Sequence, residues 1–352
     1  MKKFWIQFGA ALGGLLVLTC VFILFVDPLF YYHAPVSGIP AYFHNQVYQT
    51  AGAAEHFNYD SAIVGSSMTE NFRVSWFEEK GMDAIKLSYA GSRTADLRSV
   101  LDSVYDSSND VKYIMLDLND FQLTTDPKLT YLEKDGTALG DGVLEGPEYL
   151  FNSDVWWMAA GRIAEAVTGN EPDVDDAYTW EDAELFSKEA VKASCQEVIS
   201  LFARQKEEGT LVPADRKEML AFCEGNIANI VPVFEGHPET QFAVFFPPYS
   251  ILYWQEVVMQ ENLDVMLEVY RHAIELLMEY DNVEVFYFQD EEELITDLDS
   301  YRDVCHHSPQ INRYIFDCMM SGERQISAEN IDAYFENMYR IASEYPYETI
   351  WE

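Results

Sequence analysis

The sequence predicts an α/β protein with a parallel β-sheet between two helical layers, an N-terminal transmembrane helix and a helical insertion. Three observations support this fold class. Five short apolar runs, rich in β-branched and aromatic residues, alternate with longer amphipathic stretches, as in βαβ units. An almost uninterrupted apolar run fills the first 26 residues. The alternation is lost over residues 121–239, which indicates an insertion.

The N-terminal segment has the composition of a membrane anchor. Lys2 and Lys3 precede an apolar run from Phe4 to Val26, and no other Lys or Arg occurs before Arg73. A bilayer core requires about 20 apolar residues of helix. The positive-inside rule then places the N-terminus in the cytoplasm and the rest of the chain outside it. We therefore expect a cell-membrane protein with a single span and an extracytoplasmic main domain.

Two other interpretations of this segment fit less well. A cleaved signal peptide has a shorter apolar core and a small-residue cleavage site, whereas here Asp27-Pro28 follows the run directly. A lipoprotein would use Cys20, but apolar residues continue past it. The chain thus divides into a cytoplasmic tip and signal anchor (1–26), a juxtamembrane segment (27–58) and an extracytoplasmic domain (59–352).

The alternating part of the chain predicts the elements of the sheet and its helices. Strands are expected at Ser61–Gly65, Ala84–Tyr89, Lys112–Leu118, Gln241–Phe246 and Val283–Phe288. Helices are expected at Thr94–Tyr105, Asp182–Lys206, Ala214–Val233, Val257–Glu279 and Ala328–Tyr345. Within the insertion, loops are expected at the glycines 136, 140, 142 and 146 and at the acidic stretch 171–176. We expect this insertion to cover the functional site.

Charge excludes one class of function. The chain has 22 Lys and Arg residues against 60 Asp and Glu residues, a net charge of -38. Nucleic-acid binding depends on basic residues that displace counterions from phosphates. Nucleic acid is therefore not an expected partner, and the acidity is best read as a solvated surface.

Cysteine and histidine spacing points to neither a metal nor a cofactor. Cys20 lies in the expected membrane span, and no CxxC or His-x-x-x-His spacing occurs. The other four cysteines are Cys195, Cys223, Cys305 and Cys318. Outside the cytoplasm they could form disulfides in three pairings, or remain free buried thiols.

Polar residues follow the predicted strands where a site would form. Ligands of open parallel sheets bind outside the carboxyl ends of the strands. The first strand is followed by Ser67, the second by Gly91, the third by Asn119, and the fifth, further on, by Asp303-x-x-His306. Acyl transfer needs these groups: a nucleophile, a base, an orienting acid and donors for an oxyanion.

These blocks, in this order, resemble the four-block pattern of the SGNH/GDSL hydrolase superfamily. The anchored layout with Gly-Ser-Ser is more narrowly similar to its membrane-anchored bacterial cell-envelope branch, the branch with the DltD layout. The stretches Tyr59–Phe72, Phe245–Tyr253 and Tyr301–Ile311 carry the likeness, which spans about residues 45–345. The resemblance implies a flavodoxin-like α/β/α fold and ester chemistry on an O-acyl group.

The resemblance also implies residue roles. Ser67 matches the nucleophile, His306 the base and Asp303 the acid that orients it. The backbone N–H groups of Ser67, Gly91 and Asn119 match the oxyanion hole.

The sequence departs from the superfamily pattern at three positions. Ser66 replaces the Asp of the first block, and Asp117 stands where the third block has Gly. His307 stands where related envelope proteins carry Tyr. Each matched residue also has a structural alternative. Ser67 could cap a helix, Gly91 could sit in a turn, and Asn119 could be a loop-forming Asx residue. Asp303 could cap a local turn, and His306 could be a buried hydrogen-bonded side chain.

The sequence therefore predicts a serine esterase or O-acyltransferase that acts on acyl esters of a cell-envelope glycan or polymer, without metal or organic cofactor. A membrane-bound O-acyltransferase is a possible partner. The alternative is a catalytically degenerate SGNH scaffold or glycan-binding protein. A separation of Ser67 and His306 well beyond hydrogen-bond reach would favour that alternative. Trp156 and Trp157 are expected in the core, or else on a glycan-binding surface.

Overall fold

A computed structural model describes residues 1–43, 45–130, 146–169 and 174–352 of the chain. Its sheet has five parallel strands: β1 Ser61–Gly65, β2 Ala84–Ser88, β3 Tyr113–Asp117, β4 Gln241–Phe246 and β5 Val283–Tyr287. All five expected strands are confirmed, each to within one residue at either end. They are buried along nearly their whole length, because helices cover both faces of a parallel sheet.

The strand order is β2-β1-β3-β4-β5. This is the flavodoxin-like order, in which the chain reverses its direction of winding between β1 and β3. In the register, Val64 of β1 lies between Leu87 of β2 and Leu116 of β3. The residues that follow β1 and β3 therefore emerge side by side at the switch point, where ligands bind in folds of this kind.

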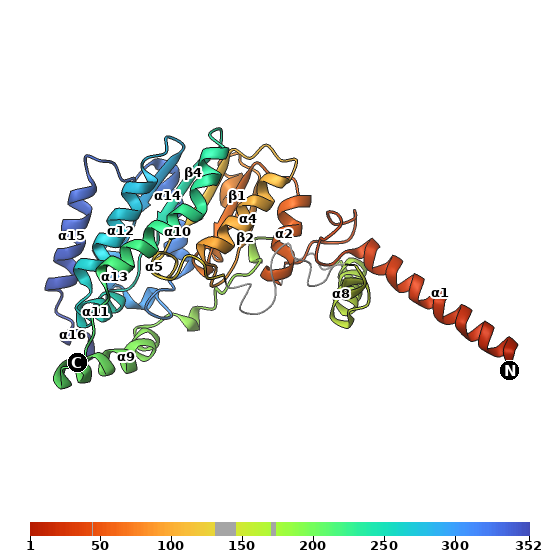
Figure 1. The fold of residues 1–352 in the computed structure, drawn as a ribbon, viewed down its shortest axis with the longest axis horizontal. Coiled ribbons are helices and arrows are strands. Elements are labelled where there is room, and N and C mark those ends of the chain that lie inside the picture. Colours follow the sequence, from red (N-terminus) through yellow and green to blue (C-terminus); the bar gives the residue numbers. More distant parts are fainter. Residues whose placement is uncertain (44, 131–145, 170–173) are drawn as a thin grey trace.

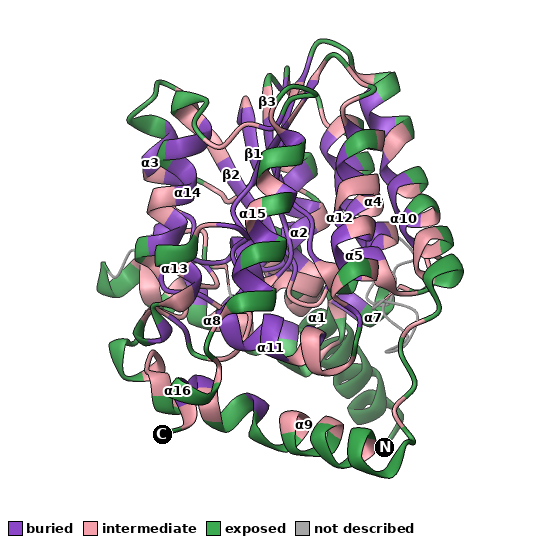
Figure 2. Cartoon of the chain, turned by 90° about the vertical axis from the view of Figure 1, so that its left-hand side faces the viewer, coloured by how far each residue is buried: buried purple, intermediate pink, exposed green. Residues whose placement is uncertain are grey.

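Helices on both faces complete a three-layer α/β/α fold, which confirms the predicted class (Figure 2). Three helices form one layer: α4 Thr94–Asp106, α10 Arg216–Gly236 and α12 Leu263–Leu277. Two cover the other face: α3 Val74–Glu78 and α14 Pro309–Ser321. The stripe Leu97, Val100, Leu101 and Val104 buries one face of α4, the spacing that an amphipathic helix needs.

Further helices and turns in the described part of the chain surround these layers. The remaining α-helices are α2 Gln46–His56, α5 Asp120–Thr124, α7 Pro147–Leu150, α8 Ser153–Thr168, α9 Lys188–Glu208, α11 Ile251–Met259, α13 Glu292–Thr296, α15 Ile331–Glu344 and α16 Glu348–Trp351. The 3₁₀ turns are η1 Ser67–Thr69, η2 Val174–Asp176, η3 Ala183–Leu185 and η4 Leu298–Ser300.

The helix expected over Val257–Glu279 is two helices, α11 and α12. Glu261 adopts a left-handed conformation with φ of 62°, which no α-helix continues through. The Asn262 N–H bonds back to the Val257 carbonyl and closes the turn. The apolar periodicity continues on both sides of this break, so the pattern alone did not locate it.

The region predicted as an insertion, residues 121–239, includes a helix of the main layer. Helix α10 packs against both α4 and α12, because it is the crossover that returns the chain from β3 to β4. Helix α9 packs against α11, and α8 lies apart, beside the N-terminal helix (Figure 1). The glycines 136, 140 and 142 and the first part of the acidic stretch lie outside the described residues.

Helix α1, Lys2–Val26, is long and apolar enough to cross a membrane. It extends away from the α/β layers, and nearly all of it is exposed except near Ile23 and Val26 (Figure 1). The five cysteines are free thiols in this structure, and Cys195, Cys223 and Cys318 are buried. Burial raises the pKa of the Cys195 and Cys223 thiols to about 12, which keeps them protonated.

Candidate active site

Three of the predicted site residues meet at the carboxyl edge of the sheet. Ser67 begins the η1 turn after β1, and Asp303 and His306 lie in the loop between η4 and α14. The Ser67 Oγ lies 2.8 Å from Nε2 of His306, and Nδ1 of His306 lies 2.8 Å from Oδ2 of Asp303. All three side chains are partly buried. With Nδ1–H donating to the carboxylate, Nε2 is left to accept the serine hydroxyl.

The Asp303 carboxylate also shapes the loop that carries the base. Its Oδ1 accepts the backbone N–H groups of Cys305 and His306, at 2.9 and 2.8 Å. Burial acts to raise the pKa of Asp303, but hydrogen bonds from His306 and the imidazole charge outweigh it, so the pKa is lowered. The carboxylate therefore stays ionised while it orients the ring.

The turn after β4 supports the same loop. The Ser250 N–H donates to the Val304 carbonyl at 2.9 Å, and the buried Tyr301 hydroxyl donates to the Pro248 carbonyl at 3.2 Å. Pro248 and its neighbours thus act as a rigid turn that holds the loop of Asp303 and His306.

Asp117, at the end of β3, supports the turn that carries Ser67. Its Oδ1 accepts the Ser66 N–H at 2.6 Å, and its Oδ2 accepts the Ser66 hydroxyl at 2.7 Å. Asp117 is fully buried, and burial raises the pKa of its carboxyl. A side chain on Gly65 would lie 2.0 Å from Oδ1 of Asp117, so only glycine fits there. Two of the three departures from the superfamily pattern, Ser66 and Asp117, thus bond directly to each other.

Asn119 does not offer the oxyanion donor that the resemblance implies. Its N–H donates to Oε1 of Gln122, and its Oδ1 accepts the Gln122 N–H, both at 3.1 Å. This reciprocal pair caps α5. The Asn119 Nδ2 donates to Oδ2 of Asp117 at 3.0 Å and to the Ser66 hydroxyl at 3.2 Å. Asn119 therefore holds the turn that carries Ser67.

Gly91 lies in the turn after β2, which the Ser92 N–H closes by bonding to the Tyr89 carbonyl at 3.0 Å. Its φ of 74° is a conformation that favours glycine. The use of its N–H and that of Ser67 in an oxyanion hole stays a prediction.

One residue that the sequence did not reveal, Trp180, borders His306. The Trp180 ring meets His306 edge to face, with centroids 5.4 Å apart. Trp180 Nε1 donates to Oε2 of Glu70, and its N–H donates to Oδ1 of Asn71 at 3.0 Å. Burial raises the pKa of Glu70. Because Trp180 lies more than 100 residues from both partners, no local pattern could have placed it here.

Lys86 ties this part of the insertion to the sheet. It is buried in β2, and its Nζ donates to the carbonyls of Glu70, Asp175 and Ala177 at 2.9, 3.1 and 2.9 Å. Burial lowers the pKa of Lys86 to about 8. A lysine inside an apolar strand is the one sequence signal that could have indicated this anchor.

His307, the neighbour of the base, is fully buried. Burial lowers its pKa to about 3, so the imidazole is neutral at physiological pH. Its ring packs edge to face on Tyr301, with centroids 6.4 Å apart. His307 thus packs in the core while His306 faces Ser67. Among the described residues, no cluster of His, Cys, Asp and Glu could hold a metal ion.

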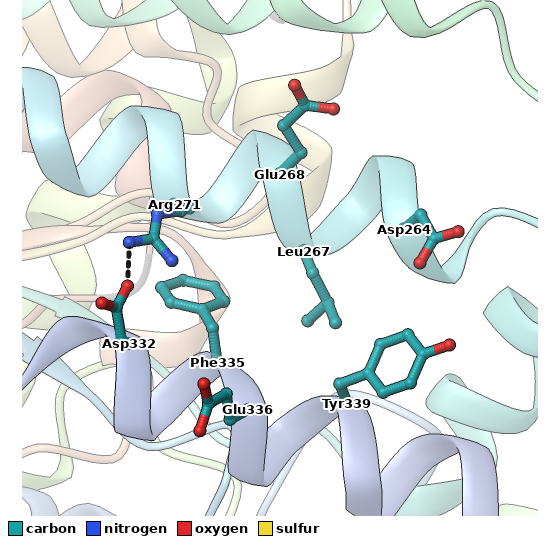
Figure 3. A pocket seen from close by; sticks show the side chains of 8 residues that line it. All are labelled: Asp264, Leu267, Glu268, Arg271, Asp332, Phe335, Glu336 and Tyr339. Carbon is teal, nitrogen blue, oxygen red and sulfur yellow. Dashed lines mark hydrogen bonds and ion pairs between the residues drawn. The ribbon is translucent and has the colours of Figure 1, made fainter.

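A hollow of about 390 Å³ lies between α12 and α15, outside the candidate active site (Figure 3). Leu267, Phe335 and Tyr339 supply its apolar lining, and Arg271 pairs with Asp332 at its rim. None of the residues that line it belongs to the Ser67–His306–Asp303 arrangement.

Comparison with known proteins gives little beyond this geometry. No protein-family model matches the chain, and no curated protein matches it. One similar solved structure is described as "The structure of a putative platelet activating factor from Streptococcus pneumonia". The two share 12% identity with a TM-score of 0.40, over 78% of this chain and 91% of the other. Function is therefore inferred from the site.

Replacing Asp117 by alanine is expected to lower the free energy of unfolding by about 3 kcal/mol. The change leaves the buried Ser66 N–H and hydroxyl without their acceptor, at about 1–3 kcal/mol for each unsatisfied group. Chemical unfolding of the full chain in detergent, followed by circular dichroism, measures this. The control Asp102→Ala removes an exposed helix pair with Arg98 and should cost no more than about 0.5 kcal/mol. Equal losses in both variants would contradict the role given to Asp117.

Proposed function

We propose that this chain is a membrane-anchored SGNH-type serine esterase or O-acyltransferase that acts outside the cytoplasm. Its substrates would be acyl esters of a cell-envelope glycan or polymer. The observation that carries the proposal is the continuous chain of contacts from Ser67 through His306 to Asp303, with both links at 2.8 Å. A nucleophile, a base and an orienting carboxylate in this geometry are the groups that acyl transfer requires.

In the proposed first step, the Ser67 Oγ attacks the acyl carbonyl carbon and Nε2 of His306 takes the hydroxyl proton. The tetrahedral intermediate collapses, the bond to the leaving oxygen breaks, and His306 returns the proton to that oxygen. The product is an acyl ester on Ser67. Asp303 stabilises the imidazolium that forms in between.

In the second step, water or a sugar hydroxyl gives its proton to His306 and attacks the acyl carbon of the acyl-enzyme. The bond between that carbon and the Ser67 Oγ then breaks, and His306 returns the proton to Ser67. Water makes the protein an esterase, and a sugar hydroxyl makes it a transferase. We assign the oxyanion contacts to the N–H groups of Ser67 and Gly91, because the Asn119 N–H already donates to Oε1 of Gln122. Each such donor contributes about 10²–10³ in rate.

A separation of Ser67 and His306 well beyond hydrogen-bond reach would have favoured the scaffold alternative. Their 2.8 Å contact supports the enzyme instead. For the transferase, an acyl donor could come from a membrane-bound O-acyltransferase partner that shares the bilayer.

The test of the proposal is a two-product assay with a p-nitrophenyl acyl ester. The purified full chain should release nitrophenol with or without an added carbohydrate acceptor, because both routes share the acyl-enzyme. For a transferase, acylated carbohydrate should accumulate at the expense of free acid, and both products are read by mass spectrometry. The same chain inactivated with a fluorophosphonate serves as the blank. Nitrophenol release no faster than that blank, over a range of ester sizes, would contradict the proposal.

Protease added to intact protoplasts is expected to digest the main domain and leave a membrane-bound N-terminal fragment. The reason is the pair Lys2-Lys3 before the apolar span and the lack of basic residues after it until Arg73. Immunoblotting with a tag at each end measures the fragments, and a cytoplasmic marker protein controls for lysis. Protection of the main domain, or release of a shortened chain into the medium, would show that the topology is wrong.

A further inference from the structure

Helix α8, Ser153–Thr168, presents an apolar face to solvent. Between residues 155 and 167, the exposed residues are Trp156, Trp157, Gly161, Ala164 and Val167. Trp157 is 68% exposed and Val167 is 81% exposed, and Phe151 just before the helix is 54% exposed. No exposed residue in this stretch is charged, in a chain with 60 acidic residues. Trp156 and Trp157 therefore do not lie in the core, where they were expected.

The opposite face of α8 is fixed, so the apolar face cannot turn inward. Val155, Ala159 and Arg162 are buried at i, i+4 and i+7. The Arg162 guanidinium donates to the Tyr42 carbonyl and lies over the Tyr42 ring, 4.9 Å from its centroid. The one cation of the helix points inward, so the outward face between residues 155 and 167 carries no exposed charged side chain. The exposed polar residues Ser153, Asp154 and Thr168 lie at the two ends of the helix.

Helix α8 also lies against the end of the candidate membrane span (Figure 1). The Trp156 ring lies 6.1 Å from that of Phe22, and Val155 and Ala159 cluster with Ile23 and Val26 of α1. The Tyr149 hydroxyl donates to Oδ1 of Asp27, directly after α1. The position of α8 relative to the candidate membrane span is thus set by its packing on the last turns of α1.

Helix α9, which also lies outside the main layers, does not share this composition. The exposed side of α9 carries polar and charged residues, among them Gln196, Glu197, Ser200 and Arg204. An exposed apolar face next to a membrane span indicates contact with lipid. Tryptophan in particular favours the level of the headgroups, where its ring is buried and its N–H stays hydrated.

We propose that α8 is an interfacial helix, with Trp156 and Trp157 inserted among the lipid headgroups and upper acyl chains of the bilayer that α1 spans. The occupant of this face is lipid, because the face is continuous with the membrane-spanning surface of α1. The helix would hold the α/β domain at a fixed height and orientation over the membrane. This role goes beyond the proposed acyl chemistry and rests on the membrane span, not on the catalytic residues.

Environment-sensitive labels on this face test the proposal. The full chain carrying Trp157→Cys, or Gly161→Cys, is labelled with a nitrobenzoxadiazole maleimide and reconstituted in phosphatidylcholine vesicles. Position 161 has open space around an added side chain, so it serves if the tryptophan variant folds poorly. Ser200→Cys on α9 is the matched exposed control. The wild-type chain reports any background from its five native cysteines.

Brominated lipid should quench the fluorescence of labels at positions 157 and 161 severalfold more than that of the label at position 200. Aqueous iodide should quench the label at position 200 more than the labels at positions 157 and 161. Equal iodide quenching at all three positions would overturn the proposal. Protection from iodide without quenching by brominated lipid would also overturn it, since protein would then cover the face. Flotation of the chain with the vesicles tests the anchor separately, and fluorophosphonate labelling tests the proposed function.

Discussion

Replacing Ser67 by alanine is expected to lower the turnover of an acyl ester by about 10⁴–10⁶-fold, because the change removes the atom that forms the acyl-enzyme. Residual activity would come only from substrate binding and from oxyanion donors. The folded state should persist, since the Ser67 hydroxyl bonds only to the partly exposed His306 ring among the described contacts. Ester hydrolysis by the purified full chain in detergent, with circular dichroism as the check on folding, measures the effect.

The same experiment has an internal chemical control. A fluorophosphonate should add one adduct to the wild-type chain at Ser67 and none to the Ser67→Ala variant, as read by intact-mass and peptide mass spectrometry. Ser200→Ala, an exposed change on α9, should keep both labelling and turnover. The Ser66 hydroxyl donates to Asp117 and is therefore not expected to react. An adduct on Ser66 would contradict the assignment of Ser67 as the nucleophile.

The adjacent histidines should respond in opposite ways. Replacing His306 by alanine is expected to reduce turnover by about 10⁴–10⁶-fold, since among the described residues it is the His306 ring that bonds to the Ser67 hydroxyl. Replacing His307 by glutamine should leave turnover within about tenfold and should mainly lower stability, by about 1–3 kcal/mol, as a changed buried polar side chain does.

Two measurements on both variants separate these effects: steady-state hydrolysis and chemical unfolding. His306 is partly exposed and contacts Ser67, whereas His307 is buried and its pKa is lowered to about 3. Loss of turnover in the His307 variant at unchanged stability, with His306→Ala still active, would exchange the two roles and contradict the proposed mechanism.

The sequence was sufficient for features that depend on local pattern. Strand positions followed from short β-branched runs such as Ser61–Gly65, because a strand buried on both faces needs continuous apolar residues. The apolar helix α1 followed from its length and composition. The pairing of Asp303 with His306 followed from a spacing of three, which lets the carboxylate bond to the ring within one turn.

The proximity of Ser67 and His306 could also be predicted, although 239 residues separate them. Parallel strands bring their carboxyl ends to one edge, so residues that follow different strands converge there. Strand order was still needed to place β1 and β3 next to each other at the switch point.

Only the tertiary structure decided how the surrounding residues are used. Asn119 had the sequence position of an oxyanion donor, but its N–H bonds to Gln122. Asp117 departed from the expected glycine, and its buried carboxylate holds Ser66. Trp180, in the predicted insertion, lies against the base. Each backbone or side-chain group can form only a few hydrogen bonds. Packing between distant segments determines which partners form them.

Tertiary packing also decided where the helices and tryptophans of the predicted insertion lie. An amphipathic pattern predicts a helix but not its partner, so α10 could not be assigned to the main layer, nor α8 to the end of α1. Trp157 is apolar enough for a core, yet it is 68% exposed because the inner face of α8 is already filled by Val155, Ala159 and Arg162. Sequence period determines which residues share a face, and only packing determines what that face meets.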